Sequence, residues 1–488
     1  MRRSYTCLAS LLLATSVLAG CESSSTPPAS SPTPAVDGGS PTADPADPTP
    51  DEIAARGSCP AATGAGTKHE GTITADETWK AADGPHNVTF GLDIRATVTI
   101  EPCALVRVAK GVRIAVGSST EAGSLVAHGT SQLIDGARDV RPVNFDALEP
   151  ASRWGQIVVL AKGTLDLSIA ALQNGGGETN NYRGALVVTG LAGGTNDGEP
   201  LRSTTLDRVL IEKSASYGLN LEGWGALTEA SDKLWIRGSG STELPSAIRI
   251  EPGIAGTLPK TIVATGNVKD EILMNTSKAF TRNDTLVNRG LPYRMKGALF
   301  LNGNKDSATP VKLSIEPGVT LAFEKDVGSG IYIGSSNTNQ GILEAVGTAE
   351  APIVFTSANA TKAPGDWLSL YFRSTPKTGS RISHARIEYA GGENTTTGYG
   401  CGPIANDAAV LIHGTGTDES GPASVFIDHT TFENIGGTTV IVSGWIDAAG
   451  PNFTGDNTFG NVVPSCKVSK PRRSGAGDVC DGGRTTCW

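Results

Sequence analysis

Residues 312–323 read KLSIEPGVTLAF, and residues 97–108 read TVTIEPCALVRV, a second version of the same stretch. In the first of these, apolar residues alternate with polar ones on both sides of a Glu-Pro-Gly break, and this period of two predicts two short β-strands, each with one buried face. Pro317 has no backbone N–H and biases Glu316 away from helix, while Gly318 is free to adopt a positive φ. The stretch therefore predicts strand, sharp corner and strand, which is the unit of a parallel β-solenoid.

The composition favours an all-β chain. The 488 residues include 61 Gly, 28 Pro and only 3 Met, and 18% are charged. Short runs of Val, Ile, Leu and Thr alternate with turn clusters, and no stretch from Ala54 onward has the spacing of an amphipathic helix. The formal net charge of −9 argues against nucleic acid as a partner, because such a partner requires a basic face that neutralises phosphates.

Residues 1–20 have the pattern of an export signal. Two arginines precede an apolar core, which closes on L-A-G-C at residues 18–21. This tetrapeptide resembles the lipobox of bacterial lipoproteins, which implies lipidation of Cys21 and attachment to a membrane without a transmembrane helix. The alternative is an ordinary secretory signal with a chance cysteine. Glu22 after the cysteine favours the outer membrane or cell surface.

The remaining chain is expected to divide into a tether, two copies of a β-helix and a cap. Residues 22–52 are rich in Ser, Thr, Pro, Ala and Asp and contain no Lys or Arg, so they cannot bury enough apolar surface to fold. The expected parts are the lipidated cysteine with a disordered linker at 21–57, copy 1 with an N-terminal cap at 58–268, copy 2 at 269–463, and a cysteine-containing C-terminal cap at 464–488.

The two copies are inferred from matches at a nearly constant shift. Ile100 matches Ile315, and Trp154 matches Trp367, at shifts of 215 and 213 residues. A strand spacing of about 20–25 residues inside each copy would correspond to one rung, and rungs lie about 4.8 Å apart. Some 400 residues then predict roughly 16–20 rungs and a rod of about 80–95 Å, with a cap at each end.

Several motifs of the second copy together resemble a known family. They are I-E-P-G-V-T-L at residues 315–321, G-x-L-x-A-x-G-T at 341–348, A-P-I-V-F-T-S at 351–357, G-D-W at 365–367 and N-T-F-G-N at 457–461. This set is similar to right-handed parallel β-helix repeat proteins of the pectin-lyase-like class, in particular surface lipoproteins of Gram-negative bacteria. The resemblance implies an all-β, right-handed parallel β-helix whose two copies of about 200 residues stack end to end. It implies little about function, because the fold hosts lyases, hydrolases and adhesins.

The catalytic sets of this class are missing from the sequence as sets. The resemblance would imply an acidic Ca²⁺ site with an arginine base for a lyase, or several Asp in N-x-D, D-D and G-H-G motifs for a hydrolase. Asp428-His429 resembles part of a lyase strand, but no Asp cluster accompanies it, so we interpret it as an outward-facing polar pair. The six histidines have no metal-binding spacing. We therefore predict no catalytic residue, no metal and no cofactor.

Six cysteines are left once Cys7 is removed with the signal and Cys21 is lipidated. They are Cys59, Cys103, Cys401, Cys466, Cys480 and Cys487. An even number in an exported chain indicates disulfides, and six cysteines allow fifteen pairings, among which the sequence does not decide. Proximity favours Cys480–Cys487 and then Cys59–Cys103, which leaves Cys401–Cys466.

Two loops stand out because they occupy matching positions in the two copies. Each follows a strand, carries a Glu among Gly and Asn, and ends near a Tyr: Glu178 and Tyr182 in the first, Glu393 and Tyr399 in the second. Such groups suit sugar hydroxyls and ring faces, although a solenoid also tolerates insertions at exposed loops. If the copies stack with little rotation, both loops project from one side.

The expected function follows from these features. We expect a monomeric, lipid-anchored envelope protein with a non-catalytic binding or adhesion role toward a polysaccharide or a surface protein. One alternative is a diverged polysaccharide lyase or glycoside hydrolase, and another is a structural spacer. A groove in which three or more carboxylates meet a Lys, Arg or His would favour the enzyme.

Overall fold

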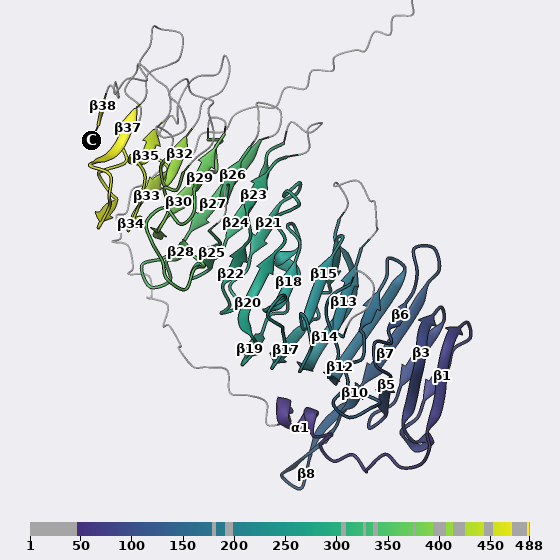
Figure 1. Cartoon of the computed structure of the whole chain (residues 1–488). Helices are drawn as coiled ribbons and strands as arrows, with labels where there is room; N and C mark the ends of the chain where they lie inside the picture. Colours follow the sequence, from purple (N-terminus) through teal and green to yellow (C-terminus); the bar gives the residue numbers. More distant parts are fainter. Residues whose placement is uncertain are drawn as a thin grey trace, which may run out of the picture. The chain divides into compact units, whose positions relative to one another are not determined.

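The computed structural model describes residues 46–177, 182–190, 199–303, 309–325, 328–334, 340–373, 376–393, 407–412, 425–443, 452–470 and 486–487. Within these residues nearly all regular structure is β-strand, arranged in successive layers along the chain (Figure 1). None of the helices in this part of the chain is long and apolar enough to cross a membrane.

The longest ladder joins fourteen parallel strands and runs through the whole described fold. In order, they are β1 (Thr67–Ile73), β3 (His86–Ile94), β6 (Ile114–Val116), β11 (Ile157–Val159), β13 (Leu186–Thr189), β15 (Leu219–Glu222), β18 (Ser246–Ile250), β20 (Lys269–Met274), β22 (Tyr293–Met295), β25 (Thr320–Phe323), β28 (Ile353–Ser357), β31 (Ala385–Glu388), β34 (Thr431–Glu433) and β36 (Thr458–Gly460). This stacking confirms the predicted parallel β-helix.

Two further ladders accompany it in the first part of the chain. One contains β5 (Leu105–Val108), β10 (Val143–Ala147), β12 (Gly163–Gln173), β14 (Leu201–Glu212), β17 (Asp232–Arg237) and β19 (Ile262–Thr265). The other contains β2 (Glu77–Trp79), β4 (Thr97–Ile100), β7 (Gly123–His128), the first halves of β12 and β14, and β16 (Gly225–Leu227). β12 and β14 belong to both ladders because each bends at a residue with positive φ, Ile169 and Arg208.

The second part of the chain builds two new ladders. One contains β21 (Asp284–Leu286), β24 (Val311–Ile315), β27 (Gly341–Val346), β30 (Arg381–Ser383) and β33 (Ile427–Asp428). The other contains β23 (Ala298–Leu301), β26 (Gly330–Ile333), β29 (Ser369–Phe372), β32 (Val410–Ile412), β35 (Thr439–Ser443) and β37 (Cys466–Lys470), followed by the antiparallel β38 (Thr486–Cys487). Only the fourteen-strand ladder crosses the boundary, through β20. The break lies beside the expected boundary at residues 268 and 269, and the duplication itself stays a prediction.

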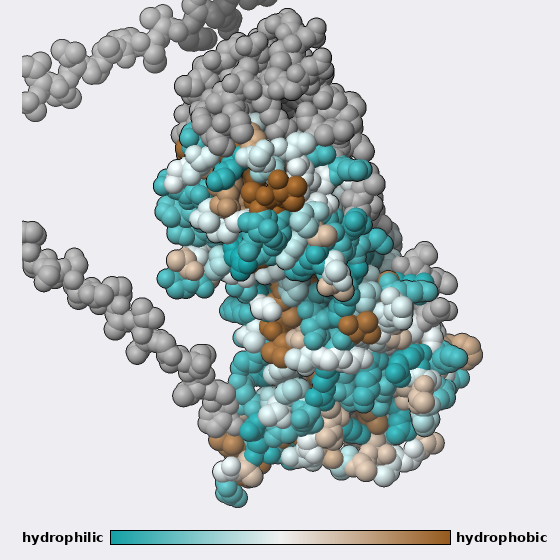
Figure 2. Space-filling model, turned by 60° about the vertical axis from the view of Figure 1, so that its left-hand side comes forward, coloured by the Kyte–Doolittle hydropathy of each residue, from teal (hydrophilic) through white to brown (hydrophobic). Residues whose placement is uncertain are grey.

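The Glu-Pro-Gly corner at residues 316–318 has the predicted geometry. Leu313, Ile315, Leu321 and other apolar residues of the stretch are buried. Gly318 has φ 80°, and Cys103, which replaces glycine in the earlier copy, has φ 69°, so both corners need the left-handed conformation. The apolar side chains of this stretch therefore point into the interior that the ladders enclose. On the face shown in Figure 2, hydrophilic residues cover most of the described surface and apolar residues form small patches.

Rungs are longer than the predicted 20–25 residues in most of the fold. Partner residues on successive rungs are 21 residues apart at Ile272 and Tyr293, but 45 apart at Ile382 and Ile427. Long connections inserted at the corners account for the difference. The ladder of fourteen strands corresponds to roughly 60 Å at about 4.8 Å per step, so the described residues form fewer rungs and a shorter stack than the predicted 16–20 rungs and 80–95 Å.

The end of the expected linker is folded, which corrects the prediction of a disordered tether over the whole of 21–57. The short helix α1 (Pro50–Ala54) has a capping box, in which Thr49 Oγ1 accepts from the Glu52 N–H at 3.2 Å and a Glu52 carboxylate oxygen accepts from the Thr49 N–H at 2.7 Å. Ile53 is fully buried in a small cluster outside the main core. The helix packs against β12, β14 and the hairpin of β8 (Thr130–Ile134) and β9 (Ala137–Arg141).

The N-terminal end of the fold is also held by a disulfide. Cys59 is bonded to Cys103, which confirms that predicted pair. Cys401 and Cys480 lie outside the described residues, so the other two pairings stay predictions. Two short 3₁₀ helices complete the fold, η1 (Ala81–Asp83) and η2 (Ala255–Thr257).

Candidate functional site

The structure describes two of the four residues predicted to contact a ligand. Glu178 and Tyr399 lie outside the described residues. Tyr182 is half-buried and packs against small apolar side chains on the outer faces of β6, β11 and β13, namely Ala115, Val158 and Val187. This position favours the structural interpretation of Tyr182, in which the loop covers apolar surface.

The two predicted loops leave different ladders. The first loop follows β12, whose second half belongs to the ladder that ends at β19. The second follows β31, which belongs to the ladder that runs back through β20 and β18 to β13. Both loops can project from one side only if the second copy is rotated little relative to the first. Because the two loops follow strands of different ladders, the structure contradicts that expectation. We therefore treat the two loops as separate features.

Glu393 lines a groove of about 610 Å³ at the corner that precedes β29. Its walls come from four segments that follow β25, β28, β31 and β34. The lining residues are Lys325, Pro364, Gly365, Asp366, Trp367, Leu368, Gly391, Gly392, Glu393, Asp407, Gly436 and Gly437. The groove thus combines three carboxylates, one amine and one indole.

Trp367 forms the fixed inner wall of the groove. Its side chain is buried, and the indole Nε1 donates a hydrogen bond to the Glu388 backbone oxygen at 2.7 Å. Its ring stacks on Phe323 of the preceding rung, with ring centroids 4.4 Å apart. An indole that is both packed and hydrogen-bonded has little freedom to move.

Asp366 is held beside Trp367 by short hydrogen bonds. Its Oδ2 accepts from Ser357 Oγ at 2.7 Å and from the Ala363 N–H at 3.0 Å, and its Oδ1 lies 4.0 Å from Lys325 Nζ. The side chain is buried, while Lys325 is largely exposed. The carboxylate is therefore oriented by the protein before any ligand arrives.

Glycines of successive rungs touch at the floor of the groove. A Cβ on Gly391 would lie 2.5 Å from the Gly436 oxygen, and a Cβ on Gly392 would lie 2.6 Å from the Gly365 oxygen. Backbone hydrogen bonds join the same segments, including Gly436 N–H to Ala390 oxygen at 2.8 Å. Only glycine allows this close approach, so the floor is a rigid backbone surface.

The groove offers hydrogen-bonding groups that suit a hydroxyl-rich ligand. In the described part of the chain, no group of three His, Cys, Asp or Glu is placed to hold a metal. Ionised carboxylates accept hydrogen bonds from hydroxyl groups, and the Lys325 ammonium donates them. Three carboxylates and a lysine in one groove also meet the condition that would favour an enzyme.

Asp428-His429 behaves as the outward-facing polar pair that we predicted. Asp428 accepts from Arg381 at 2.9 Å, from Ser383 and from His429 Nδ1 at 3.0 Å. Burial raises the pKa of Asp428, but the bonds from Ser383 and His429 and the charge of Arg381 outweigh burial and hold it below its ordinary value. The exposed His429 stacks on His384 of the preceding rung, with ring centroids 4.8 Å apart. The pair thus links neighbouring rungs.

Comparison with known families agrees with this fold. A family described as a pectate-lyase like beta helix domain matches residues 279–406. The matched segment contains Lys325, Asp366 and Glu393, and it ends just before Asp407. No curated protein and no solved structure shows a significant match to the chain. The comparisons therefore support a parallel β-helix and leave the activity open.

Sequence reasoning missed three charged residues of the groove, Lys325, Asp366 and Asp407. Asp366 belongs to the G-D-W motif of residues 365–367, which we used only as a sign of the fold. An acidic residue directly before a buried tryptophan was the signal that could have identified it. Lys325 and Asp407 have no such signal in the sequence, because only the stacking of rungs brings them to the groove.

Proposed function

We propose that the chain is a lipid-anchored protein of the cell envelope that binds a polysaccharide in the groove at Trp367 without catalysing a reaction. The observation that carries this proposal is the groove itself, where Glu393, Asp366 and Asp407 surround a rigid glycine floor. Its volume of about 610 Å³ is typical of small-ligand sites. The L-A-G-C sequence at residues 18–21 supports the anchor and a place at the outer membrane or cell surface.

Binding to a glycan array tests this proposal. The full chain should bind a subset of the glycans, and Glu393→Gln should weaken that binding about tenfold, because a charged hydrogen bond is replaced by a neutral one. The matched control is Glu350→Gln, which changes an exposed glutamate of the same part of the molecule. Equal binding by the wild type and Glu393→Gln would contradict the proposal, and binding to no glycan would favour a structural spacer.

A diverged lyase or hydrolase is the second candidate, and the three carboxylates with Lys325 favour it. Hydrolysis of a glycosidic bond usually uses two carboxyl groups, one on either side of the bond. The full chain would be incubated with each bound polysaccharide, and new reducing ends and unsaturated sugars would be measured. Products that disappear in Asp366→Asn would establish an enzyme. Polymers that stay intact with the wild-type chain would establish binding alone.

A further inference from the structure

A third corner of the same kind lies at residues 250–253. Residues 250–253 read I-E-P-G, and Gly253 has φ 91°, as the other two corners require. Glu251 fixes this corner, because one carboxylate oxygen accepts from the Gly223 N–H and from Lys278 Nζ, both at 2.8 Å. The corner lies at the end of β18, one rung before the ladders break. The chain beyond it forms η2 and then leads toward β19 to β21.

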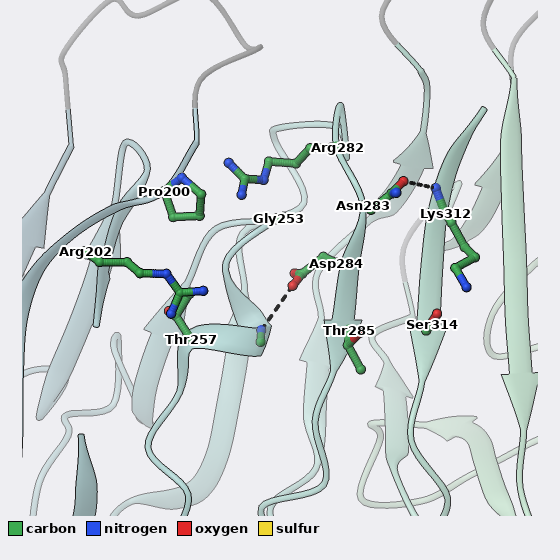
Figure 3. A pocket seen from close by; sticks show the side chains of 11 residues that line it. Pro200, Arg202, Gly253, Thr257, Arg282, Asn283, Asp284, Thr285, Lys312 and Ser314 are labelled. Carbon is green, nitrogen blue, oxygen red and sulfur yellow. Dashed lines mark hydrogen bonds between the residues drawn. The ribbon is translucent and has the colours of Figure 1, made fainter. Parts of the chain in front are cut away.

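A pocket of about 350 Å³ opens beside this corner (Figure 3). Four of its lining residues are charged: Arg202 on β14, Arg282 and Asp284 at the start of β21, and Lys312 on β24. In Figure 3 the side chains of Arg202 and Arg282 extend into the same space from opposite sides, and Lys312 lies beyond Asp284 and Thr285. Three cations and one carboxylate give the lining an excess of two positive charges, in a chain with a net charge of −9.

The single carboxylate of the lining, Asp284, accepts hydrogen bonds from the backbone. Asp284 Oδ2 accepts from the Ala255 N–H at 2.9 Å, and Oδ1 accepts from the Gly256 N–H at 3.0 Å. Burial raises the pKa of this carboxyl, although the same hydrogen bonds oppose the rise. Asp284 therefore connects β21 to η2, and within the lining three cations face this one carboxylate.

Arg282 is positioned by packing. Its guanidinium lies over the Trp224 ring, 5.2 Å from the ring centroid, and Trp224 packs against the main core. Its side chain is 18% exposed, whereas that of Glu199, its ion-pair partner at 3.2 Å, is 95% exposed. A guanidinium packed on an indole has less freedom to move than one on an open surface.

The acidic partners of the other two cations also lie toward solvent. Arg202 is 3.8 Å from Glu229, whose side chain is 88% exposed, and Lys312 is 2.9 Å from the partly exposed Glu344. Exposed ion pairs of this kind are weak and exchange readily with other anions. Glu344 also accepts from Ser314 Oγ at 2.8 Å, whereas Glu199 and Glu229 are almost fully exposed. An anionic ligand would therefore compete with these glutamates for the three cations.

We propose that this pocket binds a phosphate group, either as inorganic phosphate or as the monoester of a larger molecule. Guanidinium groups bind phosphate oxygens in pairs of parallel hydrogen bonds, and lysine adds a point charge. A phosphate monoester carries a charge of about −1.5 to −2 at neutral pH, which matches the excess charge of the lining. This pocket shares no lining residue with the groove at Trp367, so the proposal is independent of the one above.

Calorimetric titration of the full chain tests the site with four probes: inorganic phosphate, glucose 6-phosphate, sulfate and galacturonate. We expect saturable binding of phosphate or its ester, at least tenfold tighter than binding of galacturonate. Tighter binding of glucose 6-phosphate would identify an ester as the ligand, and tighter binding of inorganic phosphate would identify the free ion.

The matched variants change exposed side chains, so the fold should be kept. Arg202→Gln with Lys312→Gln should weaken phosphate binding at least tenfold, since each removes one charged donor. The control Arg113→Gln changes an arginine that is 46% exposed and lies beside Asp93 of β3. This variant should leave the phosphate affinity unchanged, as should Glu393→Gln. Circular dichroism would verify folding of each variant.

The proposal would be overturned by no binding of any phosphate probe, by equal phosphate binding in the double variant, or by equal affinities for galacturonate and phosphate. A sulfate affinity equal to that of phosphate would show that the pocket recognises tetrahedral anions in general, and the phosphate assignment would then be wrong.

Discussion

Two tryptophan corners, one in each part of the molecule, share a packing arrangement and differ in their surroundings. Trp154 and Trp367 are both buried, and each indole Nε1 donates to a backbone oxygen at 2.7 Å, that of Gln173 in the first corner and that of Glu388 in the second. The residue before the tryptophan is Arg153 in one corner and Asp366 in the other.

The described residues beside the two tryptophans differ. A Cβ on Gly175 would lie 3.0 Å from the Trp154 ring and 3.1 Å from the Ala185 side chain, and Arg153 spans the corner to Asn174 Oδ1 at 3.2 Å. In the second corner the space beside Trp367 is the carboxylate-lined groove. The tryptophan arrangement therefore serves the fold, and the residues around it decide whether a binding site forms.

Replacing each tryptophan by alanine should give the largest effect and should be similar at the two corners. Trp154→Ala and Trp367→Ala each remove a buried indole, which costs about 3–5 kcal/mol. Urea unfolding followed by far-UV circular dichroism measures the loss. A cost below about 1 kcal/mol at either corner would show that its tryptophan does not support the core and would break the comparison.

Acid should lower the stability of the first part of the fold, because His69 is buried there in its neutral form. This ring lies 3.0 Å from His86 (Nε2 to Nδ1) and stacks on Trp79. Burial, with a smaller contribution from His86, lowers the pKa of His69 to about 4, and Glu77 only partly opposes this. The unfolded chain then binds the proton more readily, so the contribution of neutral His69 is complete above about pH 6.5 and is lost as the pH falls to about 4.

The expected loss across this window is at most about 3 kcal/mol. His69→Gln should remove that part of the pH dependence, whereas His128→Gln, a half-exposed histidine, should keep it. Urea unfolding at several values between pH 7 and pH 4 would reveal the difference. An unchanged pH profile in His69→Gln would show that this ring does not titrate as its burial requires.

The corner containing Cys103 can be converted into its counterpart in the second part. Cys59→Ala with Cys103→Gly breaks the disulfide, which closes a sequence separation of 44 residues, and gives the corner the glycine found at Gly318. Loss of the cross-link should cost about 2–4 kcal/mol, reduced by the strain that glycine relieves at positive φ. Hydrogen exchange should increase near the N-terminal rungs alone. Faster exchange throughout the second part as well would show that the two parts unfold as one unit.

The sequence predicted features that depend on neighbours along the chain. The alternation around Ile315 fixed the buried face of each strand, and the residue types at 316–318 fixed the corner. The Cys59–Cys103 pair followed from proximity. Each of these features depends on local geometry, which the spacing of apolar residues or the type of a turn residue predicts directly.

Features that depend on the stacking of rungs could not be predicted. Asp366 and Asp407 meet because connections of unequal length separate neighbouring strands, and no sequence period encodes those lengths. The two loops lie on different ladders because two ladders end and two new ones begin near β20. No motif in the sequence predicts this change. Helix α1 was missed for a different reason, since the average composition of residues 22–52 concealed the Thr49 to Glu52 capping box.

Hydrogen exchange with the polysaccharide that binds best on the array tests most directly whether the Trp367 corner is the binding site. Backbone amides of residues 365–368 and 391–393 should become protected when the polysaccharide is added, and those of residues 153–156 and 174–177 should not change. Protection at the Trp154 corner, or no protection at the Trp367 corner, would contradict this account.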